Sequence, residues 1–296
     1  MSLRINTNID ALTAYRNLTQ TQQSMGTSVE RLSSGLRINK AADDAAGLAI
    51  SQGLTAQING TNQAIRNAQD GINVVQTADG ALTEVQSILQ RVRTLTVQGA
   101  NDSNDSAAKN NIVTEIKQLS AELDRIGQTT EFNGNKLLAG SSNLNFQIGA
   151  RSSASASTTG GAANALNINL TSTGLLGTAA SGMAINGSTL LGAASALTGA
   201  TAASGWSAAL DGLDAGLSSV STVRANLGAF QNRLQHTINN LSVAQTNLQA
   251  SNSSIRDTDM AAEMSNYTRT QILSQAGTSM LKQAQSNSQS VLSLLN

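Results

Sequence analysis

The C-terminal third of the chain decides its fold, through the stretch LDAGLSSVSTVRANLGAFQNRLQHTINNLSVAQTNLQASNSSI at residues 213–255. An apolar side chain recurs there at every seventh position: Leu213, Val220, Leu227, Leu234, Leu241, Leu248 and Ile255. Because a helix completes two turns in about seven residues, this repeat places the apolar side chains in one stripe along a single long helix. The stretch therefore predicts a helix of this whole length with a continuous seam against other helices.

The N-terminal end carries a second stripe of the same kind. Its members are spaced alternately four and three residues apart: Leu18, Gln22, Met25, Val29, Leu32 and Leu36. This spacing is typical of a coiled-coil seam with one polar position. Ser33, Ser34 and Gly35 near its end predict a break in the helix.

The region between the two ends is also predicted to be mainly helical. A helix runs from about Asp44 to Gln76, with Asp43 or Asp44 as its cap. Helical spacing continues from Leu82 to Leu95, so Asp79-Gly80 is either a break or a point through which the helix passes. A further helical stripe covers residues 112–126.

Two short stretches predict β-structure in the middle of the chain. Asn133-Gly134 favours a tight hairpin turn, and residues 166–170 alternate between apolar and polar side chains like a strand. The predicted fold class is therefore mainly α, with long antiparallel coiled-coil-like helices from both chain ends and a small β-hairpin region in the middle.

The C-terminal end repeats the alternating spacing. Its stripe consists of Leu273, Gly277, Met280, Ala284, Asn287, Val291 and Leu294. The tail residues Leu292, Leu294 and Leu295 are apolar, although chain ends are normally solvated. The two ends must therefore cover each other or be covered by another copy. Since both apolar faces are thin, we expect the ends to be mostly disordered in the free subunit and to fold on assembly. A self-contained antiparallel hairpin of the two ends is the alternative.

The composition excludes several classes of function. The chain has no Cys, which excludes disulfides and thiol catalysis. It has 18 basic and 18 acidic residues, so no net field indicates nucleic acid or a membrane surface as a partner. His236 is the only histidine and lies in the long heptad stretch, where we expect an ordinary helix residue. With no nucleotide-binding or hydrolase motif, we expect no enzyme activity, cofactor or metal. The absence of Pro suits long unbroken helices.

Several motifs then resemble those of one family. The segments ERLSSGLRIN (residues 30–39) and DDAAGLAIS (residues 43–51) resemble the N-terminal signature of bacterial flagellins. QRVRTLTVQ (residues 90–98) is similar to a motif in their outer helical core, and EFNG (residues 131–134) to the segment before their β-hairpins. The signature residues that carry the resemblance are Arg31, Leu32, Gly35, Arg37, Asp43 and Asp44.

The resemblance implies a domain organisation. Residues 1–43 and 257–296 would form an inner terminal helical domain, and residues 44–175 and 206–256 an outer helical core domain with β-hairpins. Residues 176–205 would be a short variable surface insertion, since the charge-free stretch 152–210 is too short for a full outer domain. The seam of the terminal helices would be Leu18, Met25, Val29, Leu32, Leu273, Met280, Val291 and Leu294.

The resemblance also implies a function and partners. The chain would be a structural subunit that polymerises into the extracellular flagellar filament for swimming motility, after type III export. Its partners would be further copies of itself, an export chaperone at the C-terminal segment, and filament cap and junction proteins. Host innate immune receptors would be further partners, through an assembly and receptor motif of Gln90, Arg91, Leu95 and Gln98. A hook–filament junction protein, which shares the terminal helices, is the alternative.

Overall fold

The computed structural model describes residues 8–138, 143–150, 164–169 and 203–293. The chain divides into two compact units. The terminal unit consists of residues 1–57 and 246–296, and the central unit of residues 58–245. The predicted insertion at residues 176–205 lies outside the described residues except for its last three, which begin a helix.

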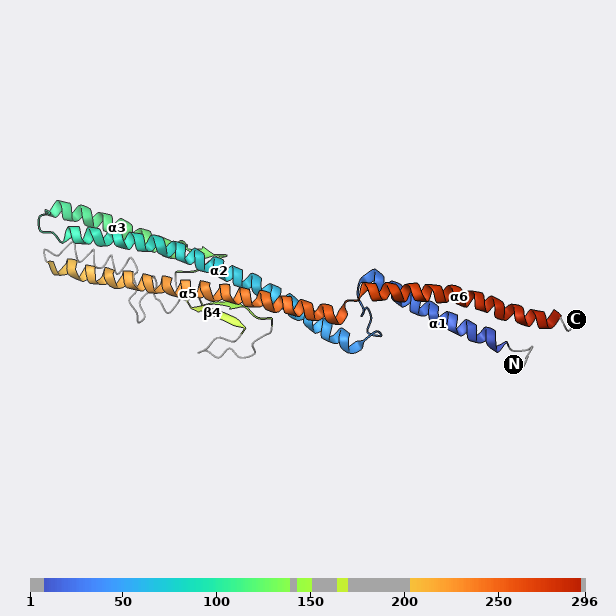
Figure 1. The fold of residues 1–296 in the computed structure, drawn as a ribbon. Coiled ribbons are helices and arrows are strands. Elements are labelled where there is room, and N and C mark those ends of the chain that lie inside the picture. The colour runs from blue at the N-terminus through green and yellow to red at the C-terminus, as the bar shows by residue number, and fades with distance from the viewer. Residues whose placement is uncertain (1–7, 139–142, 151–163, 170–202, 294–296) are drawn as a thin grey trace. The chain divides into compact units, whose positions relative to one another are not determined.

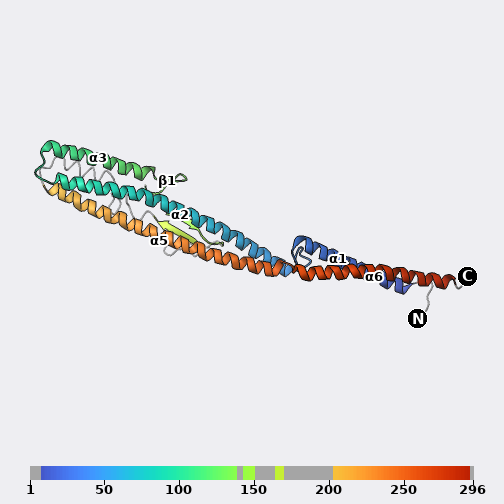
Figure 2. The same cartoon turned by 45° about the horizontal axis from the view of Figure 1, so that its top comes forward.

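The described chain is mainly helical, as the sequence predicted, with two small antiparallel hairpins (Figures 1 and 2). In chain order the elements are α1 (Ile9–Ser34), α2 (Ala45–Gly99), α3 (Ser106–Thr129), β1 (Glu131–Phe132), β2 (Asn135–Lys136), β3 (Asn143–Gln147), β4 (Ala165–Asn169), α5 (Ala203–Arg256) and α6 (Met260–Ser293).

Helices α1 and α6 lie side by side and antiparallel in the terminal unit (Figure 1). Asn8 caps the start of α1 by accepting a hydrogen bond from the backbone of Ala11. The Asn8 side chain also donates to the carbonyl of Ala284 near the far end of α6, at 2.9 Å. The pairing of the two chain ends is therefore the antiparallel one that the sequence predicted.

Helices α2, α3 and α5 form the core of the central unit. The largest fully buried side chains of this core include Leu82, Leu89, Leu123, Leu213 and Leu234. Of the two alternatives at Asp79-Gly80, the helix passes through, since α2 is continuous over 55 residues. There the Asp79 carboxylate accepts a hydrogen bond from Arg224 of α5 at 2.8 Å.

The heptad repeat lies within α5, which spans 54 residues, so the predicted long helix is confirmed. Burial changes along the repeat, however. Its first four members, Leu213 to Leu234, are buried in the core of the central unit, whereas Leu241, Leu248 and Ile255 are only half-buried. The second half of the stripe therefore still exposes apolar surface.

The β-region begins at the predicted Asn133-Gly134 turn. Both residues have positive φ, +51° and +79°, which suits a two-residue hairpin loop of the type that Asn-Gly favours. The turn joins β1 to β2, with Glu131 opposite Lys136. Strands β3 and β4 form the second hairpin, in which Leu166 and Ile168 are buried against the helices. Leu170, the last residue of the predicted strand, lies outside the described residues.

Candidate assembly surface

The inner face of α1 is a stripe of alternating three- and four-residue steps directed at α6. Its buried or half-buried members are Ala11, Ala14, Leu18, Thr21, Met25, Ser28 and Leu32. Three of the four predicted seam residues of this helix, Leu18, Met25 and Leu32, belong to it. Val29 does not, because it is 48% exposed while its neighbour Ser28 is buried.

The inner face of α6 differs from the predicted one by about one residue. Its buried or half-buried members are Glu263, Tyr267, Thr270, Ser274, Gly277, Leu281 and Ala284. The predicted Leu273 and Met280 are instead 51% and 65% exposed. The physical reason lies at Gly277, where an added Cβ would meet Leu18 of α1 at 3.3 Å. The close approach at this glycine puts Ser274 and Leu281 on the inner face, and the neighbouring Leu273 and Met280 stay exposed.

The signature residue Arg31 joins α1 to the start of α6. Its guanidinium lies 3.7 Å from the carboxylate of Glu263, whose side chain is only 9% exposed. Within the described residues, the buried Arg31 Nε has no hydrogen-bond acceptor. This pair places one nearly buried charge in a seam whose other members are uncharged.

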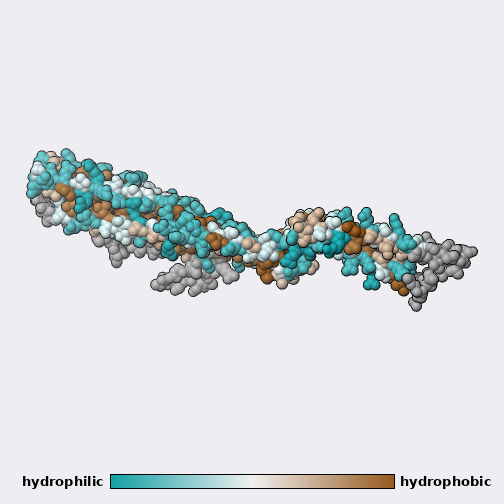
Figure 3. All heavy atoms as spheres, viewed as in Figure 1, coloured by the Kyte–Doolittle hydropathy of each residue, from teal (hydrophilic) through white to brown (hydrophobic). Residues whose placement is uncertain are grey.

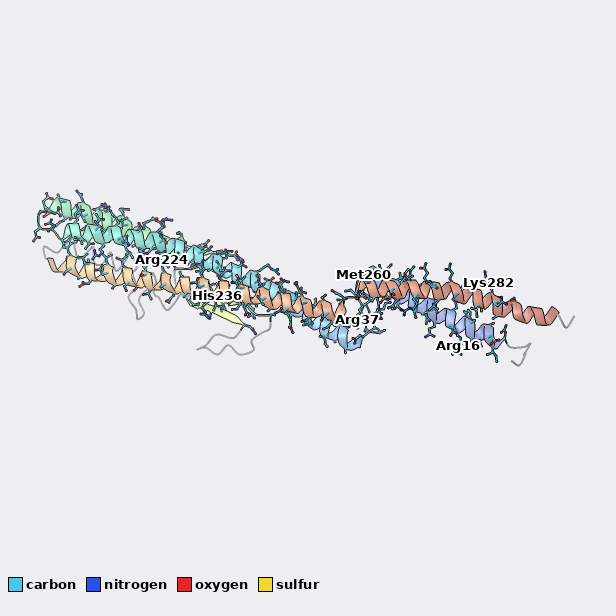
Figure 4. The ribbon with its side chains drawn as sticks, in the orientation of Figure 1. Arg16, Arg37, Arg224, His236, Met260 and Lys282 are labelled. Carbon is cyan, nitrogen blue, oxygen red and sulfur yellow. The ribbon has the colours of Figure 1, made fainter. Side chains whose placement is uncertain are left out.

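The remaining signature residues form a junction between two connecting segments of the terminal unit. Gly35 ends α1 in the left-handed conformation, with φ of +72°, and its amide donates to the carbonyl of Arg31. Arg37 lies in the loop that follows (Figure 4). Backbone hydrogen bonds tie this loop to the link between α5 and α6: Arg37 N to Arg256 O at 2.7 Å, and Thr258 N to Gly35 O at 3.0 Å.

The carboxylates of the two signature aspartates accept hydrogen bonds from different parts of the backbone. Asp44 is the cap of α2, because its carboxylate accepts a hydrogen bond from the backbone of Gly47 at 2.8 Å. Asp43 instead accepts from the backbone amides of Lys40 and Asn39, which holds the pKa of Asp43 below its usual value. Of the two predicted caps, the structure therefore assigns the role to Asp44.

The predicted assembly and receptor motif lies on α2 of the central unit. Gln90, Arg91 and Gln98 are exposed, whereas Leu95 is 2% exposed and belongs to the helical core. The Arg91 guanidinium donates twice to Glu115 of α3, at 2.6 and 2.9 Å. Only the three polar residues of the motif are thus on the surface of the subunit.

Part of the predicted site lies at the C-terminal end of the chain. Leu294 and Leu295 of the tail lie outside the described residues, and Val291 and Leu292 belong to α6 with no description of their side chains.

His236 is exposed on α5 (Figure 4). In the described part of the chain, no group of three or more His, Cys, Asp or Glu residues is arranged to hold a metal ion. None of its helices is long and apolar enough to cross a membrane.

Sequence reasoning missed the partners of the motif residues. Glu263 and Glu115 pair with Arg31 and Arg91, and the hydroxyl of Ser51 donates to Asn252 at 2.7 Å. These partners lie 24 to more than 200 residues away along the chain, so local periodicity carries no signal for them. The charge of Glu263 on a helix face of small residues is the one hint that the sequence offered.

The comparisons with known proteins agree with this architecture. Residues 5–143 match the family model described as the bacterial flagellin N-terminal helical region, and residues 210–295 the bacterial flagellin C-terminal helical region. The chain is 46% identical to a flagellin of Halalkalibacterium halodurans, over 98% of this chain and 99% of that protein. It is 44% identical to a flagellin of Bacillus subtilis, over 99% of this chain and 100% of that protein.

A solved structure with a similar fold is that of another flagellar protein. A putative flagellar hook-associated protein from Vibrio parahaemolyticus is 14% identical, with a TM-score of 0.60, over 73% of this chain and all of that chain. At this identity the likeness concerns the fold alone. The two family models and the full-length relatives decide the identity: this chain belongs to the bacterial flagellins, the structural, non-enzymatic subunits of the extracellular flagellar filament.

Proposed function

We propose that the terminal unit is the main surface through which copies of this chain polymerise. The observation that carries the proposal is where apolar side chains are exposed. Among the described residues, twelve large hydrophobic side chains are exposed, and ten of them belong to the terminal unit. These ten are Ile9, Leu12, Tyr15, Val29, Ile50, Met260, Met264, Ile272, Leu273 and Met280.

This distribution favours association because exposed apolar side chains gain free energy when they leave water. Each large aliphatic side chain gains roughly 1.5–3 kcal/mol on full burial. Apolar patches interrupt the polar surface on the described part of the α1–α6 pair (Figure 3). Leu273 and Met280, which the seam with α1 leaves outside, are suited to a neighbouring copy.

We further propose that the terminal helices complete their folding on assembly. The seam between α1 and α6 is built mainly from Ala, Ser, Thr and Gly, so it buries little apolar area for the backbone that it orders. In an isolated subunit this seam alone gives weak stabilisation. Contacts with neighbouring copies supply the rest, so folding of the ends and polymerisation become one event.

The proposed layers of the filament follow from this role. Residues 1–43 and 257–296 form the inner layer, and residues 44–175 and 206–256 the surrounding one. Both boundaries fall at helix breaks, between α1 and α2 and between α5 and α6. Residues 176–205 are the surface insertion of this arrangement.

Further partners belong to the same proposal. The export chaperone binds the C-terminal segment from about residue 257, where exposed apolar residues of α6 suit a covering protein. Filament cap and junction proteins contact the same ends. Innate immune receptors bind the polar surface of the motif at Gln90, Arg91 and Gln98, where Glu115 fixes the direction of the Arg91 guanidinium.

Seeded elongation tests the assembly surface. Purified full-length chain is added to short filament fragments, and elongation is followed by light scattering and electron microscopy. Removing residues 273–296, or the substitution Leu273→Ser, is expected to abolish or slow elongation. Val243→Ser, a matched change at a 62% exposed position of the central unit, is expected to have a smaller effect. Unchanged elongation of the truncated chain would refute the proposal.

Amide exchange tests the coupling of folding to assembly. The amides of residues 9–34 and 260–286 are expected to exchange fast in the free chain and slowly in filaments. Strong protection in the free chain would instead support the self-contained hairpin of the two ends.

A further inference from the structure

The methionines of α6 are unusually accessible. Met260, Met264 and Met280 are 47%, 50% and 65% exposed, and Met260 lies at the start of the helix (Figure 4). Met25 of α1, in contrast, is half-buried in the seam with α6. A methionine side chain is flexible and apolar, so three such exposed side chains on one helix are more costly in water than polar residues.

Among the described residues of the terminal unit, these thioethers are also the groups most open to two-electron oxidation. The chain has no Cys, so no thiol competes for an oxidant. A sulfur lone pair of Met attacks one oxygen of hydrogen peroxide, the S–O bond forms and the O–O bond breaks. The second oxygen leaves as hydroxide and takes up the proton of the oxygen now bonded to sulfur, which gives water, so the peroxide is reduced and the thioether becomes a sulfoxide.

The effect of methionine oxidation differs between the free subunit and the assembled one. In the free subunit the sulfoxide oxygen remains in water, so oxidation hardly alters the exposed side chain. On a surface that must lose water against a neighbouring copy, the polar sulfoxide has to give up its hydrogen bonds to solvent. Oxidation of the three methionines is therefore expected to weaken association while the buried core of the central unit stays intact.

We propose that Met260, Met264 and Met280 form an oxidation site at which peroxides reversibly prevent the free chain from joining a filament. The proposal rests on the proposed function, because it places the exposed apolar side chains of α6 between copies. The oxidation of methionine to its sulfoxide is chemically reversible, since methionine sulfoxide reductases restore the thioether. A filament, in which the three side chains are covered, is expected to resist the same oxidant.

The first experiment maps the reaction. Full-length free chain and preformed filaments are treated with hydrogen peroxide, and sulfoxide at each methionine is quantified by peptide mass spectrometry over time. The three α6 methionines are expected to oxidise more slowly in filaments than in the free chain. Equal rates in both states would overturn the proposal.

The second experiment links the reaction to polymerisation. Peroxide-treated chain is expected to elongate seeds more slowly by a factor on the order of ten, which corresponds to about 1.4 kcal/mol in the activation free energy of elongation. Treatment with the two methionine sulfoxide reductases, one for each sulfoxide epimer, and a thiol as the reductant should restore elongation. Unchanged elongation with all three sites oxidised would overturn the proposal, as would a loss that the two reductases do not reverse.

Variants separate the three sites from other effects of the oxidant. The triple substitution Met260→Leu, Met264→Leu and Met280→Leu keeps side-chain volume and apolarity, so it should elongate after peroxide treatment at its untreated rate. Met25→Leu, the matched control, should stay as sensitive as the unsubstituted chain. Failure of the untreated, unsubstituted chain to elongate would contradict the proposed function, whereas loss of peroxide sensitivity in Met25→Leu alone would contradict only this inference.

Discussion

Trp206, the only tryptophan of the chain, lies directly over Gly99, the last residue of α2. A Cβ placed at Gly99 would overlap three carbon atoms of the indole ring, which is itself only 3% exposed. The contact joins α5, which begins three residues before Trp206, to the end of α2 in the central unit. A residue without a Cβ is therefore required at Gly99 because the indole ring of Trp206 lies so close to the backbone there, and not because the chain turns.

Substituting Gly99 by Ala is expected to destabilise the central unit. The added methyl group must displace the ring, and overpacking of this kind costs about 1–3 kcal/mol. Gly80→Ala is the matched control, since it lies on the same helix and its Cβ would meet nothing within 4 Å. That change should stabilise by about 0.5–1 kcal/mol, because Ala loses less backbone entropy than Gly. Urea unfolding followed by Trp206 fluorescence measures the change in unfolding free energy of both variants. Equal changes in the two variants would contradict the packing argument.

The Arg31–Glu263 pair leads to a second prediction, for the terminal helices. Glu263→Gln removes a nearly buried charge that faces Arg31 and leaves the guanidinium without its counter-charge, at a cost of about 1–3 kcal/mol. Filaments of this variant should dissociate at a lower temperature, as followed by light scattering. Glu30→Gln is the control, because the Glu30–Lys40 pair is exposed and contributes little. A dissociation temperature unchanged in both variants would show that the buried pair adds nothing to the assembled ends.

Periodicity predicted the helices well because it depends only on neighbours along the chain. The seven-residue repeat from Leu213 to Ile255 lies within a single helix, and Gly80 did not end α2. A single Gly costs only about 1 kcal/mol in a helix, which the many hydrogen bonds and core contacts around it exceed. The Asn133-Gly134 turn was equally predictable, since its backbone conformation requires residues that tolerate positive φ.

Which side of each terminal helix is buried was less predictable, because it depends on how closely the two helices approach. Hydropathy favours Leu273 over Ser274 as a seam position, yet Ser274 is half-buried and Leu273 exposed. The approach at Gly277 selects small residues, and no local pattern reveals that distance. Likewise, Leu234 and Leu241 occupy the same heptad position but differ in burial, since the other elements around them differ.

The Arg93–Asp214 pair leads to a prediction about pH. The hydrogen bond and charge of Arg93 hold the pKa of Asp214 below its usual value, with the two side chains 2.6 Å apart. A lowered folded-state pKa means that the carboxylate stabilises the folded chain above the unfolded pKa, and that this contribution disappears as the pH falls through the folded pKa. Asp214→Asn should therefore be less stable than the unsubstituted chain at neutral pH, and the difference should vanish in strong acid. Unfolding curves at about pH 7 and about pH 2 check this, and a difference that persists in acid would contradict the assignment.

Gly35 gives the last prediction, through its position at the end of α1. Its φ of +72° is costly for residues with a Cβ, so Gly35→Ala should destabilise the junction by about 1–2 kcal/mol, and Gly35→Asn by less. Gly26→Ala in the middle of the same helix is the control, because its Cβ would meet nothing within 4 Å and Ala favours the helix. If the junction loop aligns α1 for polymerisation, Gly35→Ala should slow seeded elongation, Gly35→Asn should recover part of the rate, and Gly26→Ala should not slow it. Elongation that is equally fast in all three variants would mean that the left-handed residue serves only to end the helix.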